Sequence, residues 1–251
     1  MAYFKTTIEA GETIEVIKSF TKRKGAKSRG GKVKATPEEI KEINKLNSER
    51  KLRLKINANF GTDDLWIMLP YKKDERPTPE EAKAILDKFI RELRKVYKKL
   101  GVELKYIHCT EYKRKAIHHH ILINQPEGIN GAKIVRQLWG YGRPYFKLLD
   151  ETGQYKKIAA YIIKETEETF RENDGGRKQR YSCSRNLIIP KPETKVVKAT
   201  RWMPDPRPKA GYYIDQETVY NGEDRFTGRI YQSYTMVRMQ DKNERRRGLV
   251  P

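Results

Sequence analysis

The segment from residue 63 to residue 172 constrains the fold most strongly, because strand-like and helix-like stretches alternate along it. Its clearest element is a helix predicted at residues 78–100. Thr78, Pro79 and Glu81 form the start pattern of a capped helix, and apolar residues then recur at helical spacing. A helix with one apolar stripe has to cover another layer of the fold.

Further runs complete the pattern on both sides of this helix. They are a strand at 63–71, strands at 102–112 and 116–124, a helix at 130–142, a strand at 144–150 and a helix at 155–172. The second and third strands are separated by a short polar turn and are predicted to pair as a hairpin. This order is the split βαβ pattern of an α+β fold, in which helices flank an antiparallel sheet.

The chain is predicted to have four parts. Residues 1–35 form a basic N-terminal arm, because the second half of this segment holds basic residues, glycines and serines but no acidic residue. Residues 36–189 form the α+β core, which begins with another capped helix at Thr36. Residues 190–247 are an extension of short strands and loops packed on the core, and residues 248–251 are interpreted as a remnant of an expression tag.

The charge of the chain favours an anionic polymer as partner. Lysine and arginine number 54 against 33 acidic residues, which gives a net charge of +21 spread along the sequence. Such a surface suits nucleic acid, because phosphate contacts release counterions, but ribosomal proteins and proteins bound to membrane surfaces share the property. Two cysteines, no export signal and no long apolar run predict a cytoplasmic protein without a membrane span.

Three of the four histidines stand together in the strand-like run IHHHILI at residues 117–123. Side chains alternate across a strand, so His118 and His120 are expected on one face and His119 on the other. Two imidazoles on one face suit a metal ion. The alternative is a pair of hydrogen-bonded core histidines.

A third ligand is expected from the neighbouring strand. Glu111 stands seven positions before His118, and pairing across the short turn would bring its carboxylate next to the histidine face. His108 is the competitor, but it is three positions from Glu111 and therefore on the opposite face of a regular strand. Glu111, His118 and His120 are thus the predicted ligands. They suit Mn²⁺ or Mg²⁺ acting as a Lewis acid on a phosphodiester, although zinc fits the same ligands.

The helix at 155–172 carries Tyr161 and Lys164, which are three positions apart and therefore neighbours on one face. A tyrosine phenolate can attack phosphorus, and a nearby ammonium would favour the phenolate and stabilise the transition state. The alternative is a core tyrosine beside a solvated lysine. Both residues are predicted to be catalytic because they follow the histidine strand in the same α+β unit.

Three stretches, CTEYKRKAIHHHILIN, AAYIIKETEETF and RYSCSRNL, resemble the HUH endonucleases. They are more closely similar to the rolling-circle replication initiators, or Rep proteins, of bacterial plasmids, integrative elements and filamentous phages. The resemblance covers roughly residues 40–240. DLWIMLPY corresponds to the first family motif, which usually ends Leu-Thr-Tyr, and His119 occupies the position of a hydrophobic residue.

The resemblance implies an HUH-type fold and a defined activity. Such proteins use a divalent metal and a tyrosine, here Tyr161, to nick one strand of single-stranded or cruciform-extruded origin DNA. They keep the 5′ phosphate on the tyrosine, release a 3′ hydroxyl that primes replication and later rejoin the strand. The resemblance also implies a bacterial cytoplasm and a host helicase acting in trans, because GAKSRGGK at residues 25–32 is not a Walker A motif. It leaves the oligomeric state open.

The stretch RYSCSRNL is predicted to contact DNA near the expected site. Arg180, Ser182, Ser184 and Arg185 offer donors for backbone phosphates, and a solvated loop is the alternative. Tyr181 in the same stretch is a rival nucleophile, but it lacks a lysine partner on a helix.

Three aromatic residues leave their roles open. Trp66, Tyr71 and Trp139 either stack on unpaired bases or belong to the core. Two other functions also stay open. A conjugative relaxase or a single-strand transposase would use the same site on another DNA substrate, although relaxases usually carry the nucleophile before the histidine motif. A non-catalytic basic nucleic-acid-binding module would use the histidines only structurally and would form no covalent adduct with DNA.

Overall fold

The computed structural model describes residues 2–20, 35–113, 116–125, 127–128, 130–166, 181–224 and 228–240. Within these ranges the chain forms four helices and two five-stranded antiparallel sheets, which confirms the predicted α+β class. None of the described helices combines the length and apolar character that a membrane span requires. The helices are α1 (Pro37–Asn57), α2 (Pro79–Lys99), α3 (Gly131–Leu138) and α4 (Lys156–Glu165). The chain divides into two compact units, one of Met1–Asn47, Thr152–Gln154 and Ile189–Pro251, the other of Ser48–Glu151 and Tyr155–Ile188.

The second unit contains one sheet, whose strands follow the order β6-β3-β5-β4-β7. Its strands are β3 (Leu65–Pro70), β4 (Tyr106–Lys113), β5 (Ala116–Ile123), β6 (Tyr145–Leu148) and β7 (Ser182–Cys183). The strands and helices predicted between residues 63 and 172 all form in the predicted order, as far as the described residues extend. Strands β4 and β5 pair as the predicted hairpin.

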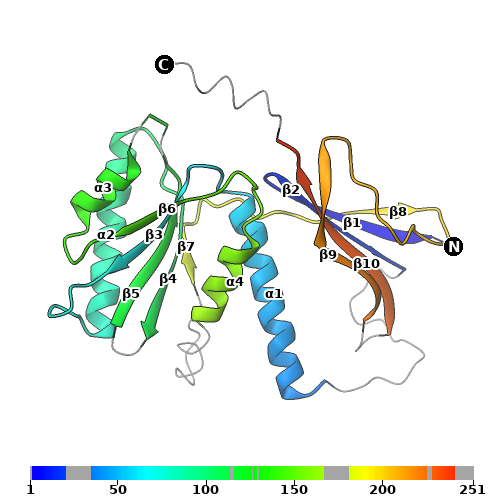
Figure 1. Ribbon diagram of the computed structural model, residues 1–251, viewed down its shortest axis with the longest axis horizontal. Helices are drawn as coiled ribbons and strands as arrows, with labels where there is room; N and C mark the ends of the chain where they lie inside the picture. Colours follow the sequence, from blue (N-terminus) through cyan, green and yellow to red (C-terminus); the bar gives the residue numbers. More distant parts are fainter. Residues whose placement is uncertain are drawn as a thin grey trace. The chain divides into compact units, whose positions relative to one another are not determined.

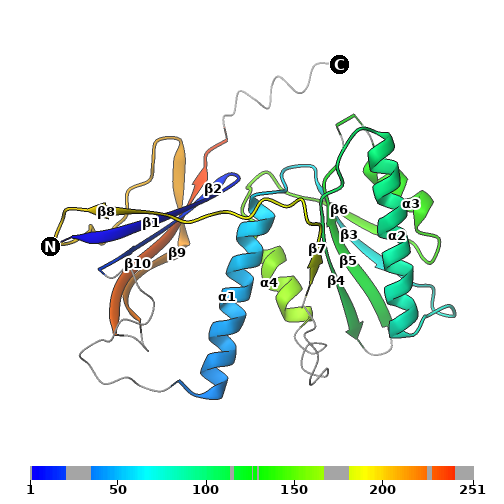
Figure 2. The same cartoon turned by 180° about the vertical axis from the view of Figure 1, so that it is seen from behind.

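Helices α2 and α3 lie on one face of this sheet, and α4 lies on the other with α1 (Figure 1). The view from behind in Figure 2 shows the same arrangement. Helix α2 starts at the predicted capping box: Glu81 N donates to Thr78 Oγ1 at 3.3 Å, and Thr78 N donates to Glu81 Oε2 at 2.8 Å. Its apolar stripe, which includes Leu86 and Leu93, packs with the inward-facing residues of β3 and β5.

A second core fills the opposite face of the sheet. Leu52 and Ile56 of α1 pack there with Ile162 of α4 and with Ile107 and Leu122 of the sheet. This part of α1 is buried, whereas the two earlier apolar positions Ile40 and Leu46 are exposed. The sheet is therefore covered on both faces, and alternate residues along β4 and β5 enter different cores.

The first unit contains a sheet with the strand order β8-β1-β2-β10-β9. Its strands are β1 (Tyr3–Ala10), β2 (Thr13–Ser19), β8 (Glu193–Val197), β9 (Tyr212–Asp224) and β10 (Arg229–Arg238). Residues 3–19 thus form a hairpin instead of an arm, because apolar residues such as Val16 are buried against β10 residues such as Tyr234. The strands predicted after residue 190 are present, but β9 and β10 are long. Residues 21–34, the main part of the predicted arm, lie outside the described residues.

Candidate metal centre and nucleophile

Glu111, His118 and His120 lie together on the α4 face of the sheet. Glu111 is the direct partner of His118 in the β4–β5 register, as the hairpin predicted, and His120 follows two residues along β5. Glu111 Oε2 is 3.1 Å from His118 Nε2 and 3.4 Å from His120 Nε2. One ligand atom from each residue lies within 4.8 Å of the others, so the three side chains could hold one metal ion.

The burial of the three side chains gives this cluster an open side. Glu111 and His120 are almost completely buried, whereas the His118 side chain is 19% exposed. Two imidazoles and one carboxylate suit a divalent cation and leave coordination positions for water or a phosphate oxygen. The donor set therefore fits Mn²⁺, Mg²⁺ or zinc, and the residues present do not distinguish between these ions.

Tyr161 of α4 places its hydroxyl at the edge of the cluster. The hydroxyl lies 3.1 Å from His120 Nε2 and donates to Glu111 Oε2 at 3.3 Å. The residue as a whole is 37% exposed, so a strand of DNA can reach the hydroxyl from solvent. Burial raises the pKa of the hydroxyl above its ordinary value, and the carboxylates of Glu111 and Glu165 raise it further. The environment thus keeps the phenol protonated until a positive charge is close to it.

Trp66 of β3 contacts both His120 and Tyr161. Its indole is stacked on the His120 ring, with centroids 5.3 Å apart and planes 10° apart, and it meets the Tyr161 ring edge-on at 6.3 Å. Stacking fixes the orientation of both rings. The sequence left the role of Trp66 open, and the structure shows it beside the cluster. Tyr71 and Trp139 lie in the core with α2, as the alternative for these two residues stated.

His119 projects from the opposite face of β5, as predicted from strand alternation. It is fully buried, and its ring nitrogens are bonded to Thr110 Oγ1 and to the Tyr71 hydroxyl, each at 2.8 Å. Burial lowers its pKa to about 3, so the ring is neutral. A neutral imidazole can accept one of these bonds and donate the other. The middle histidine is therefore a core residue.

Replacing His119 with leucine should separate the two faces of the strand. We expect His119→Leu to lower the free energy of unfolding by about 1–3 kcal/mol, because two buried hydrogen bonds are lost. Urea denaturation measures this change. Mn²⁺ affinity, measured by calorimetry on the folded variant, should stay within about twofold of the wild type, since the ligands face the other side of the sheet. A folded variant that no longer binds Mn²⁺ would contradict this assignment.

Lys164 and Tyr181 differ from Tyr161 in their surroundings. Lys164 is exposed one turn beyond Tyr161, and the described residues include no contact between its ammonium and the Tyr161 hydroxyl. Tyr181 is half-buried against the core that contains α1, and the Lys55 ammonium lies 5.4 Å from its ring centroid. Tyr161 is therefore the tyrosine that the fold brings to the metal ligands.

The four predicted DNA-binding residues lie apart from this cluster or outside the described residues. Ser182 pairs with His108 and so belongs to the opposite face of the sheet from Glu111. Ser184 is buried, and its Oγ accepts a bond from Tyr106 N at 3.1 Å. Arg185 is exposed next to them, and Arg180 is outside the described residues.

Comparison with known proteins agrees with this geometry. Residues 64–167 match the model of the family described as replication-associated protein ORF2/gene II protein. The match includes the first-motif strand, the histidine strand and the helix that carries Tyr161. No curated protein and no solved structure gives a significant match. Through residues 64–167 the chain therefore belongs to this replication-associated family of HUH-type Rep proteins, which confirms the resemblance seen in its motifs.

Proposed function

We propose that this protein initiates rolling-circle replication by nicking and rejoining single-stranded origin DNA. The observation that carries the proposal is the position of the Tyr161 hydroxyl, 3.1 Å from His120 Nε2 and 3.3 Å from Glu111 Oε2. A reachable tyrosine next to a set of metal ligands is the arrangement that phosphoryl transfer to a tyrosine requires. The match to the replication-associated family supports an origin as the substrate.

In the proposed step the Tyr161 oxygen attacks a backbone phosphorus. A bond forms between this oxygen and phosphorus, and the bond from phosphorus to the 3′ oxygen breaks. The phenol loses its proton and the departing 3′ oxygen gains one, so protons balance. The 5′ phosphate stays on Tyr161 as a phosphodiester, which allows a later 3′ hydroxyl to reverse the step without a nucleotide cofactor.

Each residue of the cluster has a proposed role. Glu111, His118 and His120 would hold Mn²⁺ or Mg²⁺. A divalent cation bound there acts as a Lewis acid on the phosphodiester and offsets the carboxylate charge that raises the Tyr161 pKa. Trp66 holds the rings of His120 and Tyr161 in place. Lys164 is proposed to approach the reacting phosphate from its exposed position on α4.

The proposed partners are single-stranded or cruciform origin DNA and a host helicase that separates the strands in trans. The order of the motifs favours an initiator over a relaxase, because Tyr161 follows the histidine strand along the chain. A single-strand transposase would share the site, and the DNA rejoined after cleavage distinguishes the two.

A covalent adduct tests the proposal. We expect the protein, incubated with a labelled single-stranded DNA library of randomised sequence and Mn²⁺, to give a protein–DNA species that survives denaturation. Excess EDTA added beforehand should lower the yield by at least about 100-fold, because the cation stabilises the transition state. A nucleic-acid-binding module would instead shift the DNA in a native gel and leave no adduct on a denaturing gel.

A further inference from the structure

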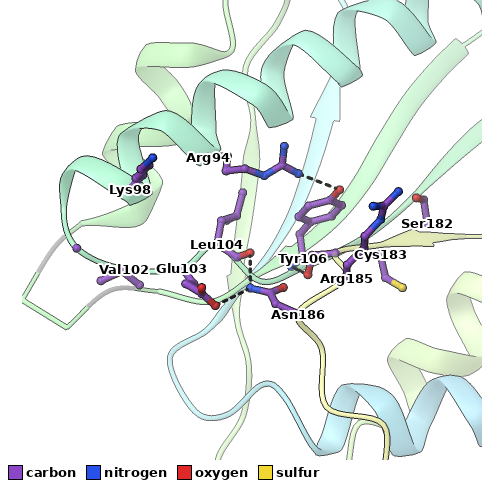
Figure 3. Close-up of a pocket in the computed structure, with 12 residues that line it drawn as sticks. Arg94, Lys98, Val102, Glu103, Leu104, Tyr106, Ser182, Cys183, Arg185 and Asn186 are labelled. Atoms are coloured by element: carbon purple, nitrogen blue, oxygen red, sulfur yellow. Dashed lines mark hydrogen bonds between the residues drawn. The ribbon is translucent and has the colours of Figure 1, made fainter.

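A groove of about 910 Å³ lies at the β4–β7 edge of the sheet (Figure 3). Its lining comes from the last two turns of α2, the loop into β4, and the chain that follows β7. Arg94, Tyr106, Arg185 and Ser182 gather at one end of this groove, while Lys98 and Glu103 lie at the other end. The groove is formed entirely by residues of the second unit.

The groove lies on the opposite face of the sheet from the metal ligands. Tyr106, His108 and Thr110 alternate along β4 with Glu111 and its neighbours, and Thr110 bonds to His119 on the α2 face. Tyr106 is on this face too, because its hydroxyl accepts a bond from Arg94 Nη2 of α2 at 3.4 Å. DNA held in the groove is therefore a different segment from the strand that Tyr161 attacks.

The charges of the groove favour an anion at its Arg94 end. Arg94 and Arg185 are exposed, and within the described ranges neither has a carboxylate partner. Glu103 is at the other end, where its carboxylate accepts a bond from Asn186 Nδ2 at 3.3 Å. The C-terminal end of α2 also points its carbonyls toward Lys98 and away from Arg94, so it does not oppose an anion beside Arg94. Two guanidinium groups and the Ser182 hydroxyl remain as donors for phosphate oxygens.

The aromatic ring in the groove is already engaged. Tyr106 stacks on His108, with centroids 5.8 Å apart and planes 22° apart, and the Arg94 guanidinium carbon lies 6.0 Å from its centroid. Proteins that hold single strands use free aromatic rings as platforms for unpaired bases. This groove presents cationic and hydroxyl donors instead, which suits the backbone of a duplex.

We propose that the groove at Arg94 and Arg185 binds the phosphate backbone of duplex DNA that flanks the nick site. The proposal rests on the proposed function, since it takes the cleaved strand to be on the α4 face. It gives Arg185 and Ser182 the phosphate contacts predicted from the sequence, but places them on a second DNA segment. It adds Arg94, which the sequence pattern did not single out.

The salt dependence of duplex binding tests the proposal. Affinity for a labelled duplex of arbitrary sequence is measured by fluorescence anisotropy between about 50 and 200 mM salt, a range over which phosphate contacts change affinity strongly. For Arg94→Gln combined with Arg185→Gln we expect the slope of log K against log salt to become shallower by about 1.8, or about 0.9 for each lost contact. Arg91→Gln, which removes a charge from α2 outside the groove, is the matched control and should leave the slope unchanged.

Three outcomes separate this proposal from the proposed function. A slope unchanged in the double variant overturns the groove as a DNA site. A shallower slope with single-stranded DNA but not with duplex overturns the assignment of duplex as its ligand. The Mn²⁺-dependent adduct on a short single strand should form at the wild-type yield in Arg94→Gln. If the wild type forms no adduct, the proposed function fails whatever the duplex measurement gives.

Discussion

Tyr161→Phe is expected to abolish the covalent protein–DNA adduct, with a fall in its rate of at least about 1000-fold. The phenylalanine ring keeps the contacts with Trp66 and His120, but it has no oxygen to attack phosphorus. Binding of single-stranded DNA should stay within about threefold of the wild type, because phosphate contacts supply most of the affinity. The rate is measured from the denaturant-resistant species on a gel, and the affinity by anisotropy.

Tyr181→Phe is the matched control for this substitution. It removes the hydroxyl of the rival tyrosine, which packs against the α1 core away from the metal ligands. The control variant should form the adduct at the wild-type rate. Adduct formation by Tyr161→Phe together with its loss in Tyr181→Phe would transfer the nucleophile to Tyr181 and contradict the site described above.

Glu111→Gln is expected to weaken Mn²⁺ binding by at least about 100-fold and to lower the rate of adduct formation by a similar factor. The amide keeps the shape of the side chain, but it removes the negative charge that lies within 3.4 Å of both histidine nitrogens. Calorimetry measures the affinity. Thermal unfolding gives a second measurement: Mn²⁺ at about 100 times its Kd should stabilise the wild type by about 2.7 kcal/mol and should hardly stabilise the variant.

Glu92→Gln provides the comparison for Glu111→Gln. Glu92 is a surface residue of α2 whose carboxylate is 2.8 Å from the Lys95 ammonium, and the same chemical change there should leave Mn²⁺ affinity unaltered. Unchanged Mn²⁺ affinity in Glu111→Gln would show that the carboxylate is not a ligand.

The sequence predicted the second unit well because its elements carry strong local patterns. The capping box at Thr78 and the long apolar stripe of α2 specify one helix, and a short polar turn joins β4 to β5. The first sheet was missed because its strands come from both ends of the chain. Pairing between β2 and β10 joins residues such as Val16 and Tyr234, and no local signal reports a contact of that sequence separation.

The same distinction holds for the candidate site. Strand alternation placed His118 and His120 on one face and His119 on the other, and hairpin pairing placed Glu111 beside them. These steps use only local geometry. The contacts of Trp66 with His120 and Tyr161 depend on how β3 and α4 meet the hairpin, so periodicity could not reveal them.

The residues after Tyr181 show the limit of such predictions. Their basic and hydroxyl side chains indicated phosphate contacts, but the face that they occupy depends on which edge of the sheet β7 joins. Because Ser182 pairs with His108, the following residues lie with Arg94 on the α2 face. The chemistry of the stretch was therefore readable, whereas its position was not.

Peptide mapping of the adduct tests the central claim most directly. The wild type is incubated with the single-stranded library and Mn²⁺, the DNA is trimmed with nuclease, and the protein is digested with trypsin. Cleavage after lysine and arginine places Tyr161 in the peptide IAAYIIK, residues 158–164, and Tyr181 in YSCSR, residues 181–185. The account predicts that the phosphate-linked nucleotide is found by mass spectrometry on Tyr161 in IAAYIIK. A nucleotide on YSCSR or on any other tyrosine peptide, with IAAYIIK unmodified, would contradict it.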